Sequence, residues 1–374
     1  AASLPMALQS GILRKVRHWA GQLILWRARQ CSGDRSMGIK LKRLEDQVMV
    51  ITGATSGIGL ATAKRAAERG ARLVLCSRNE TELQETVDQI QRNGGIARSL
   101  VADVSDQDSM ERLAATAVEE FGSLDTWVNN AGVSFYGRLT EVAIEDMRQL
   151  FEVNFWGTVY GTRAAVAQMR GTGGALINIG SIVSDRAVPL QGAYSASKHA
   201  IKGFTDALRM ELEEEGVPVS VTLIKPSAID TPYFKHAKNY MEVQPKPPAP
   251  VYAPEVVANA ILRAAEHPVR DITIGGGGRF ISALGTALPR LTDFYMERAM
   301  FSSQRSDIPS EGRSGNLYQP AEEENRERGG YQGHVMRSSV YTQAALSPAR
   351  ALLVAGLGLA VFAGIRSLTS SGED

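Results

Sequence analysis

The chain has 374 residues, of which 44% are hydrophobic and 22% charged, and its formal net charge is +1. This apolar content can fill a sizeable core, which excludes a chain that is disordered throughout. Near-neutral charge argues against a nucleic-acid-binding protein, whose basic residues would be in excess on one face. The two cysteines, Cys31 and Cys76, are too few and too far apart for a disulfide framework or a thiolate metal site. We expect an intracellular, globular α/β protein.

Residues 1–40 form a basic N-terminal extension. Within residues 1–36, Asp34 is the only acid, whereas the basic residues are Arg14, Lys15, Arg17, Arg27, Arg29 and Arg35. The apolar stretch from Trp19 to Trp26 is too short to span a bilayer, and no cleavage site follows a long apolar run, so a secretory signal is not expected. Two interpretations stay open: a disordered extension ahead of Met37, which we favour, and a basic amphipathic helix on a membrane surface.

Residues 41–301 alternate between strand and helix patterns. Short β-branched runs occur at Val48–Thr52, Arg72–Cys76, Thr126–Val128, Ala175–Ile179 and Val219–Ile224. Longer stretches of helical period occur at Gly59–Arg69, Glu80–Arg92 and Asp108–Phe121. Strands that alternate with helices predict βαβ units and a doubly wound, Rossmann-type parallel sheet with helices on both faces. We assign this stretch to one catalytic domain.

The last part of the chain changes character twice. Residues 302–343 are rich in Ser, Gly, Glu and Arg without an apolar period, which predicts a flexible, disordered linker. Residues 344–374 contain an apolar run, 351–365, bounded by Arg350 and Arg366. As a helix it would be roughly 22 Å long, against a hydrocarbon core of about 30 Å. It is either a short membrane anchor that leaves the catalytic domain in the cytoplasm, or a helix that docks on a partner.

A glycine-rich turn follows the first predicted strand, in the run Thr52-Gly53-Ala54-Thr55-Ser56-Gly57-Ile58-Gly59. Glycine permits a tight turn and a close approach of the backbone to a pyrophosphate, and the helix that follows offers free N–H groups. Glycines also occur in ordinary strand-to-helix turns, so a purely structural role stays an alternative. No Lys-Ser or Lys-Thr follows the glycines, which excludes a Walker loop.

The end of the second predicted strand bears on the choice of cofactor. An acid there would bind the adenosine ribose hydroxyl of NAD, whereas a basic residue would accommodate the 2′-phosphate of NADP. The chain has Ser77 and Arg78 and no acid at this point. A guanidinium can bind a phosphate through two N–H groups, so NADP is favoured over NAD. The alternative is a solvated surface arginine.

Tyr194 and Lys198 are four residues apart on a predicted helix, and Ser181 lies at a strand end before it. The spacing places Tyr194 and Lys198 on one helix face. We expect the ammonium, together with a cationic nicotinamide ring, to lower the pKa of the phenol from its reference value of about 10. Tyr194 would then exchange a proton with a substrate hydroxyl, and Ser181 would steady the charge on that oxygen.

These motifs together resemble the short-chain dehydrogenase/reductase family in its single-domain form. The resemblance covers about residues 41–280 and adds Asn129-Asn130-Ala131-Gly132, Asn154 and the run that starts at Pro226. A serine, Ser227, stands where the family usually has glycine. The resemblance implies a catalytic tetrad of Asn154, Ser181, Tyr194 and Lys198, with Asn154 holding a water of a proton relay. It implies cofactor contacts at Gly53, Ser56, Gly57, Ile58, Gly59, Ser77, Arg78, Asp103, Val104, Asn130, Ala131, Gly132, Tyr194, Lys198, Pro226, Ile229 and Thr231.

The predicted function is an NADP-dependent oxidoreductase that interconverts a secondary alcohol and a carbonyl, with Tyr194 as general acid/base. The alternative is a non-catalytic dinucleotide-binding scaffold with the same fold. No metal is expected, because the five histidines are scattered. Tyr233, Phe234, Tyr240 and Met241 indicate a lipophilic alcohol or carbonyl as substrate, or simply pack a lid. The resemblance implies a homodimer or tetramer.

Overall fold

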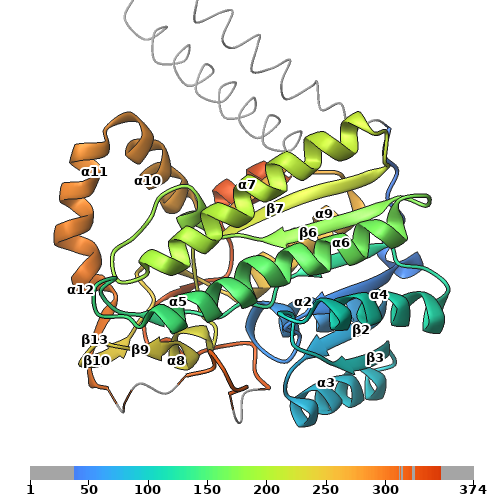
Figure 1. The fold of residues 1–374 in the computed structure, drawn as a ribbon, viewed down its shortest axis with the longest axis horizontal. Coiled ribbons are helices and arrows are strands. Elements are labelled where there is room, and N and C mark those ends of the chain that lie inside the picture. The colour runs from blue at the N-terminus through green and yellow to red at the C-terminus, as the bar shows by residue number, and fades with distance from the viewer. Residues whose placement is uncertain (1–37, 311, 313–314, 322–324, 347–374) are drawn as a thin grey trace, which may run out of the picture. The chain divides into compact units, whose positions relative to one another are not determined.

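The computed structural model describes residues 38–310, 312, 315–321 and 325–346, and those from Ile39 onward belong to one compact unit. Its centre is a parallel seven-stranded sheet in the order β12-β7-β6-β4-β1-β2-β3 (Figure 1). The strands are β1 (Val48–Thr52), β2 (Arg72–Ser77), β3 (Ile96–Val101), β4 (Thr126–Asn129), β6 (Gly174–Ile179), β7 (Val219–Pro226) and β12 (Asp271–Ile274). The predicted Rossmann-type fold is confirmed, and the two edge strands, β3 and β12, are not among the predicted strand runs.

Helices cover both faces of this sheet. One face packs against α2 (Gly57–Glu68), α3 (Glu80–Arg92) and α9 (Pro254–Glu266), and the other against α4 (Gln107–Phe121), α6 (Gly157–Met169) and α7 (Gly192–Glu214). All five residues of β1 are buried, as expected for a strand covered on both sides. The helices begin at polar caps where the chain supplies them: the Asn79 side chain accepts from Glu82 N, and the Asp106 side chain from Ser109 N.

The order of the sheet locates the functional cleft. The chain moves outward from β1 to β2 and β3, and then returns to the opposite side of β1 with β4. Ligands of doubly wound folds bind beyond the carboxyl ends of the strands at such a reversal. The segments that follow the carboxyl ends of the strands are β5 (Phe135–Tyr136), α5 (Ile144–Phe151), η2 (Glu152–Trp156), η3 (Ile182–Ser184), β8 (Ala228–Ile229), α8 (Tyr233–His236), β9 (Lys238–Asn239), β10 (Val243–Pro245) and β11 (Val251–Tyr252). The short helix η1 (Leu44–Asp46) precedes β1 at the opposite edge.

The C-terminal part of the described chain differs from the predicted disordered linker over 302–343. Its elements are α10 (Gly276–Ala287), α11 (Pro289–Tyr295), η4 (Met296–Met300), α12 (Phe301–Ser303), β13 (Arg305–Pro309), β14 (Val335–Met336) and α13 (Val340–Leu346). Strand β13 pairs with β10, and β14 pairs with β11. Tertiary pairing orders this polar segment, which a composition without apolar period could not indicate.

Two predictions concern residues outside the described part of the chain. They are the N-terminal extension over residues 1–37 and the apolar run 351–365. Among the helices that the structure describes, none is long and apolar enough to cross a membrane. The described residues likewise contain no cluster of His, Cys, Asp or Glu that could hold a metal ion.

Candidate active site

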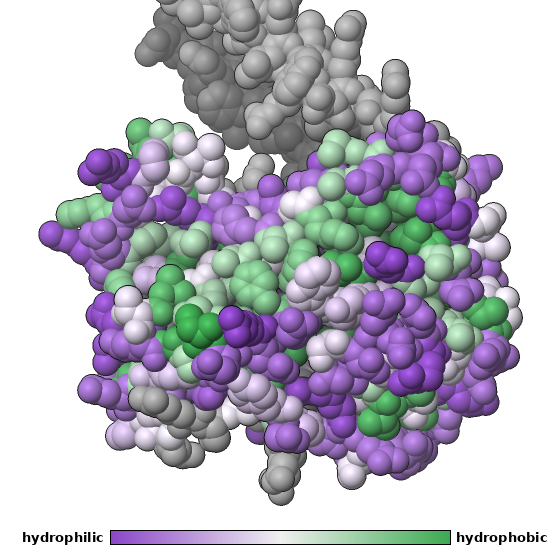
Figure 2. Space-filling model, viewed as in Figure 1, coloured by the Kyte–Doolittle hydropathy of each residue, from purple (hydrophilic) through white to green (hydrophobic). Residues whose placement is uncertain are grey.

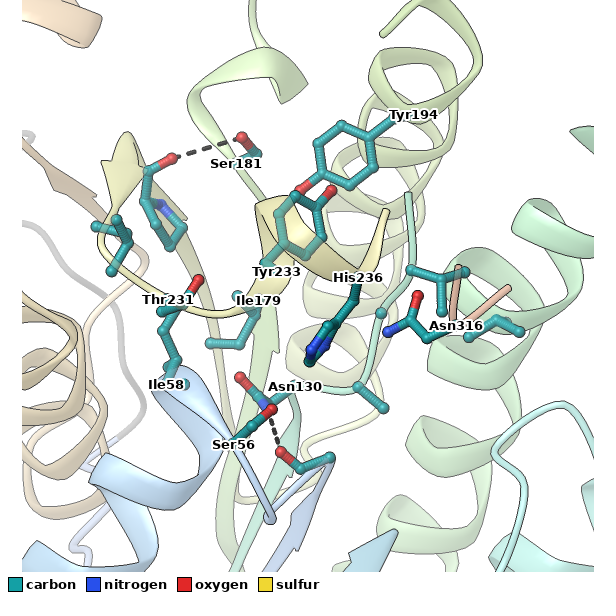
Figure 3. Close-up of a pocket in the computed structure, with 18 of the residues that line it drawn as sticks. Ser56, Ile58, Asn130, Ile179, Ser181, Tyr194, Thr231, Tyr233, His236 and Asn316 are labelled. Atoms are coloured by element: carbon teal, nitrogen blue, oxygen red, sulfur yellow. Dashed lines mark hydrogen bonds between the residues drawn. The ribbon is translucent and has the colours of Figure 1, made fainter. Parts of the chain in front are cut away.

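A cavity of about 300 Å³ lies at the carboxyl ends of β1, β4, β6 and β7. It brings together residues from across the sequence, and Figure 3 shows several of them pointing into one space. All the predicted site residues line it except Gly59 and Asn154, which lie directly behind its wall. The motifs found separately in the sequence therefore form one site.

The glycine-rich turn brings backbone close to backbone. Gly53 has φ +64°, and a Cβ there would lie 2.9 Å from Ala131 Cα. Gly59 sits beneath the turn, where a Cβ would lie 2.0 Å from the carbonyl oxygen of Gly53. The Asn130 side chain fixes this approach by donating to the carbonyls of Thr52 (2.9 Å) and Gly53 (3.0 Å). Gly59 thus shapes the turn, and Gly53 and its neighbours line the cavity.

The first turn of α2 presents backbone donors to the cavity. The Ile58 and Gly59 N–H groups have no hydrogen-bond partner within the described residues, whereas Gly57 N donates to Arg326 O at 3.0 Å. A helix N-terminus with free N–H groups is suited to an anion such as a pyrophosphate. The turn has the shape and the donors that a dinucleotide needs.

The second strand of the sheet ends in the sequence Cys76-Ser77-Arg78, and all three residues line the cavity. The Arg78 side chain is 21% exposed and lies 3.7 Å from the Asp103 carboxylate. The Ser77 hydroxyl is 3.2 Å from that of Thr55 in the glycine-rich turn. Burial raises the pKa of the Cys76 thiol to about 12, so this thiol is inert at neutral pH. A basic group therefore lines the cavity at the position that is predicted to read the adenosine ribose.

Ser181, Tyr194 and Lys198 meet at the other end of the cavity. Ser181 follows β6 and caps η3, its hydroxyl accepting from Val183 N at 3.2 Å and pointing to the Pro226 carbonyl at 3.5 Å (Figure 3). Tyr194 and Lys198 are one turn apart on α7, and the Lys198 ammonium lies 5.7 Å from the centre of the Tyr194 ring. The Lys198 Nζ donates to Ile179 O at 2.7 Å. The predicted side chains thus converge on one point.

Burial sets the pKa directions of Tyr194 and Lys198 in the protein without its cofactor. Burial raises the pKa of Tyr194 above 10, and contacts with the Tyr233 and Ser181 hydroxyls only partly offset this. Burial also lowers the pKa of Lys198 from 10.5 to about 8. Burial is thus the main influence on both groups in the protein alone. The expected lowering of the phenol pKa involves a cationic nicotinamide ring as well as Lys198, and it stays a prediction.

Asn154 lies in a π-helical turn, η2, between α5 and α6. The residue is fully buried, accepts from Val133 N at 2.8 Å and donates to Val133 O at 3.0 Å. Single π-helical turns often occur at functional sites because the extra residue redirects a side chain. Here the turn directs the amide toward Gly132 and the residue after it. A Cβ on Gly132 would lie 3.3 Å from Asn154 Oδ1 and 3.9 Å from Lys198 Nζ. Asn154 is thus placed behind Lys198.

The predicted lid is divided by the structure. Tyr233 and Phe234 line the cavity, whereas Tyr240 and Met241 do not. The Tyr240 hydroxyl instead donates to the Asp146 carboxylate and accepts from Ala143 N. Tyr240 is structural because this bond ties the segment after β9 to the start of α5.

Several lining residues were not predicted. They are Val183, Val188, Gln191, His236, Pro248, Met300, Gln304, Asn316, Pro320 and Ala321. Gln191 donates to the Gln304 side-chain oxygen at 3.1 Å, joining α7 to the segment after α12. Asn316, Pro320 and Ala321 belong to what we call the C-terminal strap, residues 315–321 and 325–330. The strap carries no motif, and its only sequence signal is the apolar pair Leu317 and Tyr318 among polar residues.

The comparisons with known proteins agree with this geometry. The profile of the short chain dehydrogenase family matches residues 47–241. A Bacillus subtilis protein described as uncharacterized oxidoreductase YxnA is 49% identical over 323 residues, covering 85% of this chain and 91% of that protein. A 3beta-hydroxysteroid dehydrogenase from Mediterraneibacter gnavus is 36% identical over 196 residues, covering 52% of this chain and 70% of its own.

Solved structures similar to this chain include dehydrogenases with a bound dinucleotide. An alcohol dehydrogenase from the archaeon Thermococcus sibiricus, complexed with 5-hydroxy-NADP, aligns with TM-score 0.54 and 27% identity over 61% of this chain and 95% of that one. A short chain dehydrogenase/reductase from Burkholderia phymatum, in complex with NAD, aligns with TM-score 0.57 and 26% identity, covering 72% of this chain and 100% of that one. The fold and the site define a dinucleotide-binding oxidoreductase. The chain belongs to the short-chain dehydrogenase/reductase family.

Proposed function

We propose that this protein is an NADP(H)-dependent oxidoreductase that interconverts a lipophilic secondary alcohol and the corresponding carbonyl. The observation that carries the proposal is the meeting of Ser181, Tyr194 and Lys198 at the end of a cavity whose other end exposes Arg78. At one end, these three side chains can transfer a proton and donate hydrogen bonds to a substrate oxygen. At the other end, the Arg78 guanidinium can bind a phosphate.

The residues present fit a dinucleotide. The turn at Gly53 leaves no room for a side chain, and the Ile58 N–H group has no partner within the described residues. The presence of Arg78 in the cavity lining supports binding of a 2′-phosphate. The nicotinamide would lie near Pro226, Ile229 and Thr231, and Lys198 would bind its ribose. When bound, the cofactor supplies the acceptor or donor of hydride.

Tyr194 handles the proton. In the oxidation direction, the substrate hydroxyl gives its proton to the Tyr194 oxygen as hydride leaves the adjacent carbon; in reduction both transfers reverse. Ser181 donates to the same oxygen and stabilises its charge. Lys198, backed by Asn154, passes the proton onward, and its pKa of about 8 lies near the working range for that task.

The substrate end of the cavity is mainly apolar. Its walls come from Val183, Val188, Tyr233, Phe234, Pro248 and Met300, with the two amides Gln191 and Gln304. This lining supports a lipophilic substrate with few polar groups. The 3beta-hydroxysteroid dehydrogenase among the relatives supports the same class of substrate.

The predicted homo-oligomer stays a prediction. Hydrophobic side chains gather over the face formed by α5, α6 and α7 (Figure 2). Trp156 is 42% exposed and Met210 60% exposed. Apolar surface of this kind supports pairing of two copies along these helices.

The replacement Tyr194→Phe tests the proposed chemistry. The phenyl ring keeps the packing and removes the proton-transferring oxygen, so we expect the hydride-transfer rate to fall by about 10²–10⁴-fold. NADPH affinity, followed by nicotinamide fluorescence, should stay within a factor of about two, because a lost hydroxyl contact of this kind is small. An unchanged rate would rule out Tyr194 as the acid/base, and failure of the wild type to bind any dinucleotide would favour the scaffold alternative.

A further inference from the structure

The C-terminal strap lies along the adenosine end of the cleft. Asn316, Pro320 and Ala321 line the same cavity as Arg78 and Asn130, and Figure 3 shows Asn316 facing the lining residues. The strap falls outside residues 47–241, to which the family profile matches. It is therefore an addition to the shared dinucleotide fold.

Backbone carbonyls of the strap accept hydrogen bonds from groups assigned to the cofactor. Arg78 Nη2 donates to Asn316 O at 2.6 Å, and Arg78 Nη1 donates to Tyr318 O at 3.3 Å. Beside it, Asn79 Nδ2 donates to Ala321 O at 3.2 Å. With the bond from Gly57 N, these contacts fix the strap over the end of β2 and the start of α2.

The first piece of the strap is held at the side of α5. Leu317 is fully buried, and the Tyr318 hydroxyl donates to Asp146 Oδ1 at 2.8 Å. The Lys238 ammonium lies 5.6 Å from the centre of the Tyr318 ring. At Gly315 a Cβ would lie 2.5 Å from Lys238 N, so the chain passes in close contact here.

The second piece is held by ion pairs with helices on the other side of the cleft. Arg328 Nη2 lies 2.7 Å from Glu255 Oε1 on α9, and Glu327 lies 3.4 Å from Lys64 and 3.8 Å from Arg65 on α2. The Glu327 carboxylate is 22% exposed, so these pairs are only partly screened by water. None of these five residues lines the cavity.

The strap covers the cavity and does not fill it. The space between the strap and the sheet remains part of the 300 Å³ cavity, and Ile58, whose N–H group has no partner within the described residues, still lines it. Arg78 has N–H groups beyond the two that the strap uses, since a guanidinium carries five. A dinucleotide phosphate and the strap can therefore share this residue.

We propose that the strap is the outer wall of the cofactor site, that it closes over the bound dinucleotide, and that it must open for cofactor exchange. Release of the cofactor is then governed by the Glu327 and Arg328 anchors, which do not touch the cofactor. The inference rests on the proposed function, because it takes Gly57 and Arg78 as cofactor-binding residues.

A double variant of the full chain, Glu327→Gln with Arg328→Gln, removes both anchors without changing the net charge. Stopped-flow displacement of NADPH should show release faster by about tenfold, with weaker equilibrium binding. The matched control is Arg170→Gln with Glu215→Gln, which removes an exposed ion pair of 2.5 Å between the ends of α6 and α7. Neither residue lines the cavity. The control should release NADPH at the wild-type rate.

Hydrogen exchange on the unaltered protein gives a second, independent measurement. NADPH should slow exchange of the strap amides, because a closed strap over the ligand opens less often. Unchanged release in the double variant, or faster strap exchange with NADPH, would overturn the proposal; tighter binding by the variant would mean that strap and cofactor compete. If the variant unfolds, the exchange experiment alone decides. Failure of the wild type to bind NADPH would instead refute the proposed function.

Discussion

The two ends of the cleft are built in different ways. At the catalytic end, Ser181, Tyr194 and Lys198 come from neighbouring elements and are held by bonds within them, such as Lys198 Nζ to Ile179 O. At the adenosine end, Arg78 meets carbonyls 238 and 240 residues further along the chain. The catalytic end is buried and fixed by local structure. The adenosine end is partly exposed and is covered by residues that are distant in the sequence. Chemistry and cofactor exchange can thus be changed separately.

Lys198→Met would test how strongly burial acts at the catalytic end. The fall in the Lys198 pKa from 10.5 to about 8 corresponds to about 3 kcal/mol of folding free energy lost at neutral pH. Because the folded pKa is the lower one, this loss is complete below pH 8 and disappears as pH rises through 10.5. The variant should therefore be more stable than the wild type at pH 7, and the difference should fade at alkaline pH.

Denaturant unfolding across this pH range measures the effect, and turnover of the variant should be lost. A stability difference that does not change with pH would mean that Lys198 is not desolvated in the folded protein. The contrast between a buried catalytic end and a partly exposed adenosine end would then not extend to the charge of Lys198.

Arg78→Ala makes the corresponding change at the adenosine end. A charge-assisted contact with the 2′-phosphate is worth about 2 kcal/mol, so NADPH affinity should fall roughly 30-fold while NADH affinity changes little. Arg98→Ala is the matched control, since Arg98 pairs with Glu120 on the same side of the sheet and does not line the cavity. Equal losses for both cofactors would show that Arg78 acts through the strap carbonyls and not by reading the phosphate.

Tyr233→Phe should give the smallest effect, again at the catalytic end. The Tyr233 hydroxyl lowers the pKa of Tyr194, acting against burial, and the two rings are 5.7 Å apart. Its removal should move the rising limb of the pH–rate profile for alcohol oxidation to higher pH. Tyr240→Phe, whose hydroxyl bonds Asp146 outside the cavity, should leave the profile unchanged. A shift of the same size in both variants would mean that the Tyr233 hydroxyl has no specific effect on the pKa of Tyr194.

The same contrast explains what could be predicted from the sequence. The strands around β1, the glycine-rich turn and the Tyr194–Lys198 spacing were predictable because each depends on residues close together in the chain. The raised pKa of Tyr194 was not, since it depends on how many atoms the fold packs around the phenol. Nor was the strap, whose bonds to Arg78 use backbone carbonyls that any residue type provides.

Leu317 illustrates the point. It is completely buried among side chains of the core, although the stretch around the pair Leu317 and Tyr318 is polar and shows no helical or strand period. One apolar residue in such a stretch does not distinguish a linker from a segment that packs against a distant surface.

The link between Arg78 and the strap also bears on how the protein is made. Ribosomes deliver the N-terminal residues first, so β1, α2 and β2 can begin to form long before residues 316–328 exist. Until those residues emerge, the nascent sheet edge lacks the carbonyls that hold Arg78 and the ion pairs with α2 and α9. Contacts between such distant residues form slowly. We therefore expect the adenosine end of the cavity to be completed last, and a chain that stops before residue 316 to leave that end uncovered.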